Sequence, residues 1–316
     1  FTSIDRFFYN NTEFTQKVNW DTSRVTSAKQ AFYKTANTGN NIDWNLPKLV
    51  SADEMFANAT VASVTLNAPI LENAKGIFKG AKNNTTTDIV DLSSATKITS
   101  WEEAFSGFIG GSVIVNTDNA QNLNAMFLNS SCKPNLSELN VENVTTMIET
   151  FAGMTGAPNT FEDISTWNVT KVRNLKGTFS NLQSRHNTVI DLTMWNTAAI
   201  TNMESTFANT QADVKAYFWD TSSVLSMNQM FENNTAMNSD LSGWCVPTTT
   251  HVNFDKGTSS AWTRGEKPNW GTCPRQENLW PIEGTDGKTY YKRDAHWITT
   301  YGNGEGIQFP CENGRP

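Results

Sequence analysis

The residue types that most often carry chemistry are scarce in this chain. Among 316 residues there are three histidines, His186, His251 and His296, and four cysteines. No serine or cysteine nucleophile motif lies near the histidines, and no metalloprotease, phosphate-loop or dinucleotide-binding motif is present. The neighbouring carboxylates Glu102 and Glu103 could form an acid and base pair, but Glu103 occupies a position that repeats along the chain with a structural role. We therefore expect no catalytic residue, no cofactor and no metal site, so the chain is not predicted to be an enzyme.

Composition narrows the class of protein further. The net charge of −7 argues against a nucleic-acid partner, which needs a basic surface. No run of 18 apolar residues occurs, so we expect no membrane insertion by this segment. Only 38% of residues are hydrophobic and 17% are charged, and the remainder is rich in Asn, Thr and Ser. This composition is typical of an extracellular protein at a cell surface.

An internal repeat explains this composition. A phenylalanine recurs about every 25 residues, which is within the range of solenoid repeats. Because residues Phe1 to Asn10 already occupy positions of such a unit, we expect the chain to start inside a repeat and to be part of a longer polypeptide. The recurring residues are Phe8, Phe32, Phe56, Phe78, Phe105, Phe127, Phe151, Phe179, Phe207, Phe231 and Phe254.

The positions around each phenylalanine resemble a short helix. In the unit of Phe179, the residues seven and four positions earlier are apolar, Val172 and Leu175. Asn174 is of the type that caps a helix N-terminus, and Asn181 is of the type that ends a helix in a left-handed conformation. Most other units repeat these types. The pattern predicts one capped helix of about two turns in every unit.

A second set of positions predicts a strand in each unit. A bulky residue, often tryptophan as in Trp167, Trp195 and Trp219, lies twelve residues before each phenylalanine, and Asp or Asn follows it. Alternating stretches such as 113–115 lie just upstream and read as strands. We therefore expect an α/β repeat solenoid of the leucine-rich-repeat type. It would have one short parallel strand and one short helix per coil, about ten coils, and a small β-rich C-terminal appendage.

The units resemble a known family. The stretch Trp219-Asp-Thr-Ser-Ser-Val-Leu-Ser-Met-Asn-Gln-Met-Phe231 is similar to the mycoplasma-type lipoprotein repeat of the BspA-like leucine-rich-repeat surface proteins. This resemblance covers about residues 1–275. It implies a solenoid on the cell surface that is used for adhesion or recognition, and it supplies no catalytic residues.

The domain organisation follows from where the repeat decays. Residues 1–244 are predicted to form the solenoid, and 245–275 a capping unit held by a disulfide between Cys245 and Cys273, which bracket the degenerate repeat. Residues 276–316 contain two hairpin signals and are predicted to form a small β-hairpin tail or the start of a further module. The pairing of Cys132 and Cys311 stays open.

Candidate ligand-binding residues lie on the outer edge of the coils and in the tail. One predicted row on the coil edge includes Lys17, Asn41, Ser63, Glu138, Thr166, Met194 and Phe218. The tail adds the aromatic residues Trp280, Tyr291 and Trp297, which could stack on sugars or simply complete a small core.

Three functional hypotheses follow. The first is a non-catalytic cell-surface adhesion or recognition module that binds a protein or glycan receptor on a host, a neighbouring cell or a surface. The second is a structural spacer or scaffold of an extracellular filament or virion fibre, which would place the chain on the virion surface. The third and weakest is a polysaccharide-degrading enzyme, because no column of carboxylates repeats from coil to coil.

Overall fold

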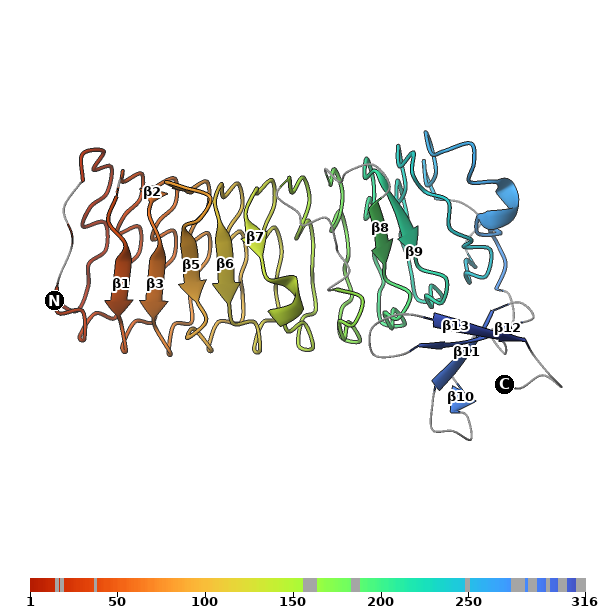
Figure 1. The fold of residues 1–316 in the computed structure, drawn as a ribbon, viewed down its shortest axis with the longest axis horizontal. Coiled ribbons are helices and arrows are strands. Elements are labelled where there is room, and N and C mark those ends of the chain that lie inside the picture. The colour runs from red at the N-terminus through yellow and green to blue at the C-terminus, as the bar shows by residue number, and fades with distance from the viewer. Residues whose placement is uncertain are drawn as a thin grey trace.

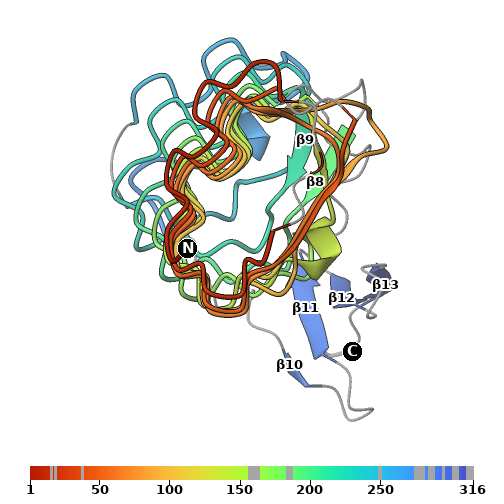
Figure 2. The ribbon, with the colours of Figure 1, turned by 90° about the vertical axis from the view of Figure 1, so that its left-hand side faces the viewer.

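The chain winds into a stack of parallel coils. The computed structural model shows the coils side by side along one axis, and the end-on view superimposes them into one closed outline (Figures 1 and 2). The structure describes residues 1–14, 17, 20–36, 39–155, 164–182, 188–247 and 251–273, together with strand residues 282–283, 289–293, 296–300 and 306–310.

One face of the stack is a parallel sheet in the order β1-β3-β5-β6-β7 (Figure 1). Each strand presents alternate side chains to the interior and to the outside, as the period of a strand requires. The strands are β1 (Ile42–Asn45), β3 (Val64–Asn67), β5 (Ile89–Leu92), β6 (Ser112–Val115) and β7 (Lys133–Pro134). Two smaller parallel pairs join β2 (Thr60–Val61) to β4 (Lys82–Asn83), and β8 (Thr188–Asp191) to β9 (Ala212–Lys215).

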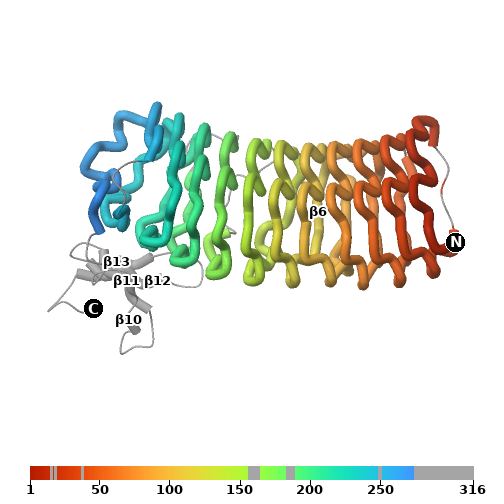
Figure 3. Tube along the Cα trace, turned by 180° about the vertical axis from the view of Figure 1, so that it is seen from behind, coloured from red at the N-terminus to blue at the C-terminus, as the bar shows by residue number. Residues whose placement is uncertain are grey.

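The predicted helix in each coil is wrong, and with it the leucine-rich-repeat α/β class. The residues that the structure describes contain no α-helix, and the fold is a β-solenoid. Its two helical turns are of the 3₁₀ type, η1 (Leu136–Glu138) and η3 (Arg264–Glu266). Seen from behind, the expected helical segments are stacked zigzags (Figure 3).

These zigzags are successive turns whose N–H groups alternate between two acceptors. Around Phe32, one set of N–H groups closes turns inside the coil, and the set between them donates to the next coil. The closing bonds are Ala31 to Ala28 (3.2 Å), Tyr33 to Gln30 (3.2 Å) and Thr35 to Phe32 (3.1 Å). The bonds to the next coil are Ala28 to Ser51 (2.9 Å), Gln30 to Asp53 (3.0 Å), Phe32 to Met55 (2.7 Å) and Lys34 to Ala57 (2.9 Å).

The turns require a left-handed backbone two residues before and two residues after each phenylalanine. Glu149 and Gly153, on either side of Phe151, have φ of 52° and 64°. A Cβ added to Gly153 would lie 2.1 Å from Oδ1 of Asn129 in the preceding coil, so glycine is required there. A left-handed residue two positions before the phenylalanine interrupts any α-helix at its middle.

The predicted cap residues perform their chemistry in a different setting. Oδ1 of Asn174 accepts the N–H of Lys176 at 2.9 Å, which is the bond of an Asx turn as well as of a helix cap. Their backbones form a ladder of isolated parallel bridges from coil to coil. The ladder comprises Ser3, Ser27, Ser51, Asn73, Ser100, Asn122, Thr146, Asn174, Asn202 and Ser226.

The Asp and Asn column after the tryptophans also forms local turns. Asn168 Oδ1 accepts the N–H of Thr170 at 3.2 Å, and Asp220 Oδ1 accepts that of Ser222 at 3.0 Å. We had expected this column to bind the backbone of the next coil. A bond between coils occurs from Asn67 to Asn45, and it joins their side chains.

Aromatic columns form the core. The phenylalanine rings from Phe8 to Phe231 stack with successive centroids 4.8 to 5.8 Å apart. Trp195 and Trp219 stack at 6.2 Å, and each donates its indole N–H to a carbonyl of the preceding coil. Packing and a satisfied polar group therefore coincide in one side chain.

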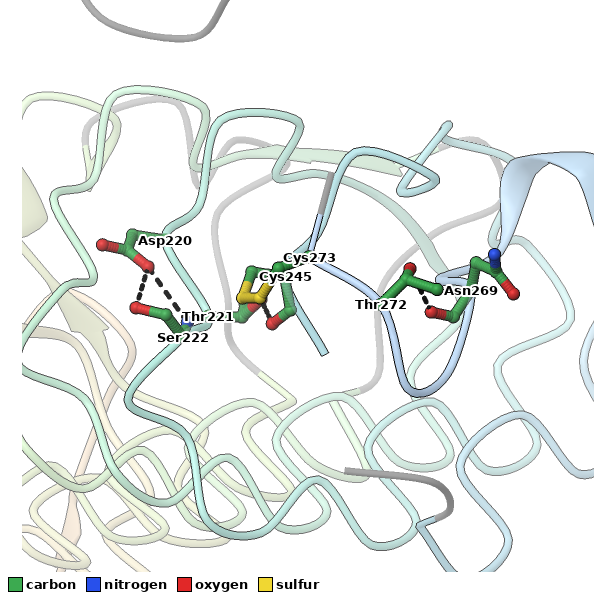
Figure 4. The surroundings of a disulfide bond; sticks show 7 residues. All are labelled: Asp220, Thr221, Ser222, Cys245, Asn269, Thr272 and Cys273. Atoms are coloured by element: carbon green, nitrogen blue, oxygen red, sulfur yellow. Dashed lines mark hydrogen bonds between the residues drawn. A yellow bond between two sulfur atoms is a disulfide. The ribbon is translucent and has the colours of Figure 1, made fainter. Parts of the chain in front are cut away.

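A disulfide links the last coil to the segment that follows it. The predicted bond between Cys245 and Cys273 is confirmed (Figure 4). Thr221 of the preceding coil donates its hydroxyl to the carbonyl of Cys245 at 2.7 Å, and Val246 pairs with Thr272 in an antiparallel bridge. By the loop-entropy model a bridge across 28 residues contributes about 3–4 kcal/mol. The boundaries proposed for the three domains stay a prediction.

The ring stack ends because the last unit is shifted by one residue. The N–H of Phe231 donates to the carbonyl of Phe254, whereas in earlier coils this acceptor is the residue before the phenylalanine. Phe254 therefore does not continue the column. Its ring meets Phe231 edge-on at 79°, and Trp262 also meets Phe231 edge-on, at 67°. Edge-on rings close the apolar column without offering a face for another ring.

A histidine replaces a backbone acceptor at this end. In earlier coils the equivalent of the Met227 N–H donates to a carbonyl, as Met203 does to Ser226. Met227 instead donates to Nδ1 of His251 at 3.2 Å, and the ring of Trp270 lies 5.1 Å from the imidazole. Burial lowers the pKa of His251 below its ordinary value of 6.5. The hydrogen bond requires an unprotonated Nδ1.

The C-terminal strands form an antiparallel sheet in the order β10-β11-β12-β13. They are β10 (Ile282–Glu283), β11 (Thr289–Arg293), β12 (His296–Thr300) and β13 (Gly306–Pro310). Antiparallel pairs therefore flank both hairpin signals of the sequence. The turn residues themselves lie outside the described residues.

Ala125→Gly should stabilise the protein by about 0.5–1 kcal/mol, because Ala125 has a φ of 53° and glycine removes a Cβ penalty of about 1–2 kcal/mol. In a helix the same change would cost about 1 kcal/mol. Urea unfolding followed by circular dichroism measures the difference. Ala198→Gly, at an exposed position outside the left-handed set, is the control and should destabilise by about 0.5–1 kcal/mol. A loss in both variants contradicts the turn geometry.

The cap should lose stability in acid through His251. Its pKa is lowered in the folded state, so the neutral ring favours folding above about pH 6.5, and this contribution is lost as the pH falls through the folded pKa. Melting temperatures between about pH 8 and 5 measure it, with His251→Gln as the variant that keeps an acceptor but does not titrate. Equal acid sensitivity in both proteins contradicts the assignment.

Candidate binding face

The outward side of the parallel sheet is the broadest regular surface of the solenoid. We define the sheet face as the outward side chains of β1, β3, β5 and β6. Strand register places four of them in one row across neighbouring coils. The row consists of Asp43, Thr65, Asp91 and Ile114.

The chemistry of the sheet face changes at each coil while the interior does not. The row reads carboxylate, hydroxyl, carboxylate and alkyl, whereas the inward neighbours Trp44, Leu66 and Val113 are all buried and apolar. Ile89 and Ile114 are 42% and 39% exposed on adjacent strands β5 and β6. Exposed apolar side chains within a polar surface are typical of contact sites for other molecules.

The predicted coil-edge residues fall into two groups. Thr166, Met194 and Phe218 each precede a buried tryptophan of the stacked column, so they lie at equivalent positions in three coils. Thr166 is exposed, Met194 is 37% exposed, and Phe218 is half-buried with its ring edge-on to Tyr217. The other group, Lys17, Asn41 and Ser63, lines a hollow at the beginning of the sheet.

The predicted tail residues are placed only in part. Tyr291 lies in β11 opposite Ile298, and Trp297 lies in β12 opposite Lys292. Their side chains and the whole of Trp280 lie outside the described part of the chain.

The carboxylate pair suggested by the sequence is engaged in ion pairs. Glu102 contacts Lys75 at 2.9 Å, and Glu103 contacts Lys79 at 2.8 Å. The hydrogen bond to Glu102 raises the pKa of Lys75. Similar pairs join other coils, such as Lys176 with Glu204 at 3.0 Å. Exposed pairs contribute little energy, and here they favour one alignment of successive coils.

The remaining polar groups offer little reactive chemistry. Cys132 is unpaired and fully buried, and burial raises the pKa of its thiol to about 12. Cys311 lies outside the described residues. Within the described ranges, no group of three or more His, Cys, Asp or Glu residues is placed to hold a metal ion. In that same part of the chain, no helix has the length and apolarity to cross a membrane.

Comparison with known proteins places the chain in a family. Residues 1–91, 96–213 and 183–259 match the family described as Mycoplasma protein of unknown function, DUF285. The chain belongs to this family. The DUF285 match confirms the mycoplasma-type repeat, but it does not extend to the BspA-like leucine-rich-repeat assignment. No curated protein and no solved structure matched the chain.

Several residues of interest escaped the sequence analysis. Trp20 was assigned to the core column, yet it is 40% exposed, whereas Trp44 of the next coil is 4% exposed. Asp43 and Thr65 were not distinguished from other strand residues. The available signal was positional, because a column is covered on one side only at its first member.

Cys132 should not react with a maleimide in the native protein, because its thiol is buried and protonated at neutral pH. Mass spectrometry of the Cys311→Ser variant measures this, and one label should be added only in urea. Cys132→Ser in the same background is the control and should take no label in either state. Rapid stoichiometric labelling of the native protein would contradict this placement of the thiol.

Proposed function

We propose that the chain is a non-catalytic recognition module that acts outside the cell and binds a protein or glycan receptor through the sheet face. The observation that carries the proposal is the varied row Asp43, Thr65, Asp91 and Ile114 above a uniform buried core. A scaffold that varies its outer side chains while keeping its interior is suited to recognition.

The finer family assignment supports the location of this module. The resemblance of the repeats to BspA-like surface proteins favours a cell-surface location, with a virion surface as the alternative. The disulfide between Cys245 and Cys273 agrees with an oxidising compartment outside the cytosol.

A structural spacer is the second candidate. The first coil exposes Phe1 by 83% and Phe7 by 51%, and such aromatic surface at the end of a stack favours contact with another molecule. This function would show itself as self-association of the purified chain.

Ile89→Glu with Ile114→Glu should weaken receptor binding about tenfold or more, because two carboxylates would be desolvated against the partner. Protein and glycan arrays identify the receptor, and surface plasmon resonance measures the Kd. The control pair, Ile109→Glu with Leu225→Glu, changes exposed aliphatic residues that lie outside the sheet face and should bind normally.

Three results would contradict the proposal. Equal loss or equal retention of binding in the two variant pairs removes the sheet face as the binding surface. Concentration-dependent self-association without receptor binding favours the spacer. Turnover of a polysaccharide that one carboxylate substitution abolishes would make the chain an enzyme.

A further inference from the structure

An open hollow of about 610 Å³ lies where the parallel sheet begins. This volume is within the range of small-molecule sites, about 300–1,000 Å³. We call it the Trp20 hollow. The lining residues that matter for its chemistry are Trp20, Asp21, Asn41, Asp43, Ser63 and Thr65.

The hollow exists because β1 is the edge strand of its sheet. Ile42 and Leu46 donate their N–H groups to the carbonyls of Ser63 and Asn67 in the next coil, at 2.9 and 2.8 Å. In a parallel strand alternate N–H groups point to opposite sides, so the N–H groups of Asp43 and Asn45 point toward the free edge. Backbone donors thus join the side chains at the hollow.

One wall is aromatic. Trp20 stacks on Phe8 at 5.3 Å and on Trp44 at 6.5 Å, and Phe7 meets it edge-on at 4.9 Å. These contacts hold the indole in place, and 40% of the side chain remains exposed. A held and partly exposed indole offers apolar contact to C–H groups at little cost in conformational entropy.

The other walls are polar and mainly accept hydrogen bonds. Asp43 and Thr65 are exposed and directly opposite each other in the strand register. The Ser23 hydroxyl and N–H bond to the carboxylate of Asp21 and lower its pKa, so this carboxylate remains ionised. Two carboxylates against one cation, Lys17, disfavour an anionic ligand.

The edge is too short for an extended peptide. Thr22 donates its hydroxyl to the carbonyl of Asn45 at 2.8 Å, so one end of the β1 edge is already occupied. An added strand needs several consecutive free backbone groups. A ligand that brings hydroxyl donors and an apolar ring face agrees better with these walls.

We infer that the Trp20 hollow binds a neutral saccharide, with one sugar ring on the indole of Trp20 and its hydroxyl groups on Asp43 and Thr65. This inference rests on the proposed recognition function and narrows its ligand at this end of the solenoid to an uncharged glycan.

Isothermal titration of the full chain with maltotetraose, cellotetraose, chitotetraose and mannotetraose tests the inference. At least one of these neutral tetrasaccharides should bind. Asp43→Ala and Thr65→Val should each weaken that binding, Asp43→Ala by about tenfold or more, because a hydrogen bond to a charged group is lost. Thr65→Val keeps the shape of the side chain, so its effect cannot come from misfolding.

Asp91→Ala is the matched control, since Asp91 lies in the same row but outside the hollow. It should bind the tetrasaccharide as the unchanged protein does. Absence of binding by all four neutral sugars overturns the inference, as does equal binding by the Asp43→Ala protein. Binding confined to sulfated or sialylated glycans, or to an extended peptide, also overturns it.

The two proposals can fail separately. If an array receptor is lost in the Ile89→Glu and Ile114→Glu protein but kept in Asp43→Ala, the sheet face stands and the saccharide site is wrong. If the chain binds no array receptor and no tetrasaccharide, both are wrong.

Discussion

Alternation of the backbone N–H groups is the constraint on which this fold depends. In the segment around each phenylalanine, every second N–H closes a turn in its own coil and the others donate to the next coil. No coil can satisfy its backbone alone, because half of these donors have their acceptors elsewhere. The left-handed residues, such as Glu149 and Gly153, are the conformational cost of that alternation. The stacked rings of Phe151 and its neighbours offset this cost by burying a continuous apolar column.

The sequence predicted the columns well and their backbone poorly. Phe179 is buried, Asn181 is left-handed, and Cys245 pairs with Cys273, as the repeat indicated. The helix failed because apolar spacing of three and four residues also describes consecutive turns, and because Asn174 accepts the same local N–H in an Asx turn as in a cap. Gly177, in the middle of the supposed helix, was the signal that contradicted it.

The functional surface could be predicted only in outline. A period of two within 113–115 identified outward positions, but register across coils was needed to place Asp43 beside Thr65. Exposure of Trp20 depends on its place at the edge of the array, which a column of similar residues conceals. The one-residue shift at Phe254 was equally hidden, since phenylalanine is apolar in either register. Sequence periodicity describes the average coil, whereas the candidate site lies where one coil departs from the average.

The disulfide joins only one end of the stack, and this makes the coils unequal. In a linear array, stability passes from each unit to its neighbours, so coils near a covalent closure open least often. The coils of Phe8 and Phe32 lie farthest from Cys245 and Cys273. Amide protection against solvent exchange will therefore decline from the C-terminal coils toward the N-terminal ones. The surface beside Trp20 consequently belongs to the part of the solenoid that frays first, where small adjustments of the coil cost least.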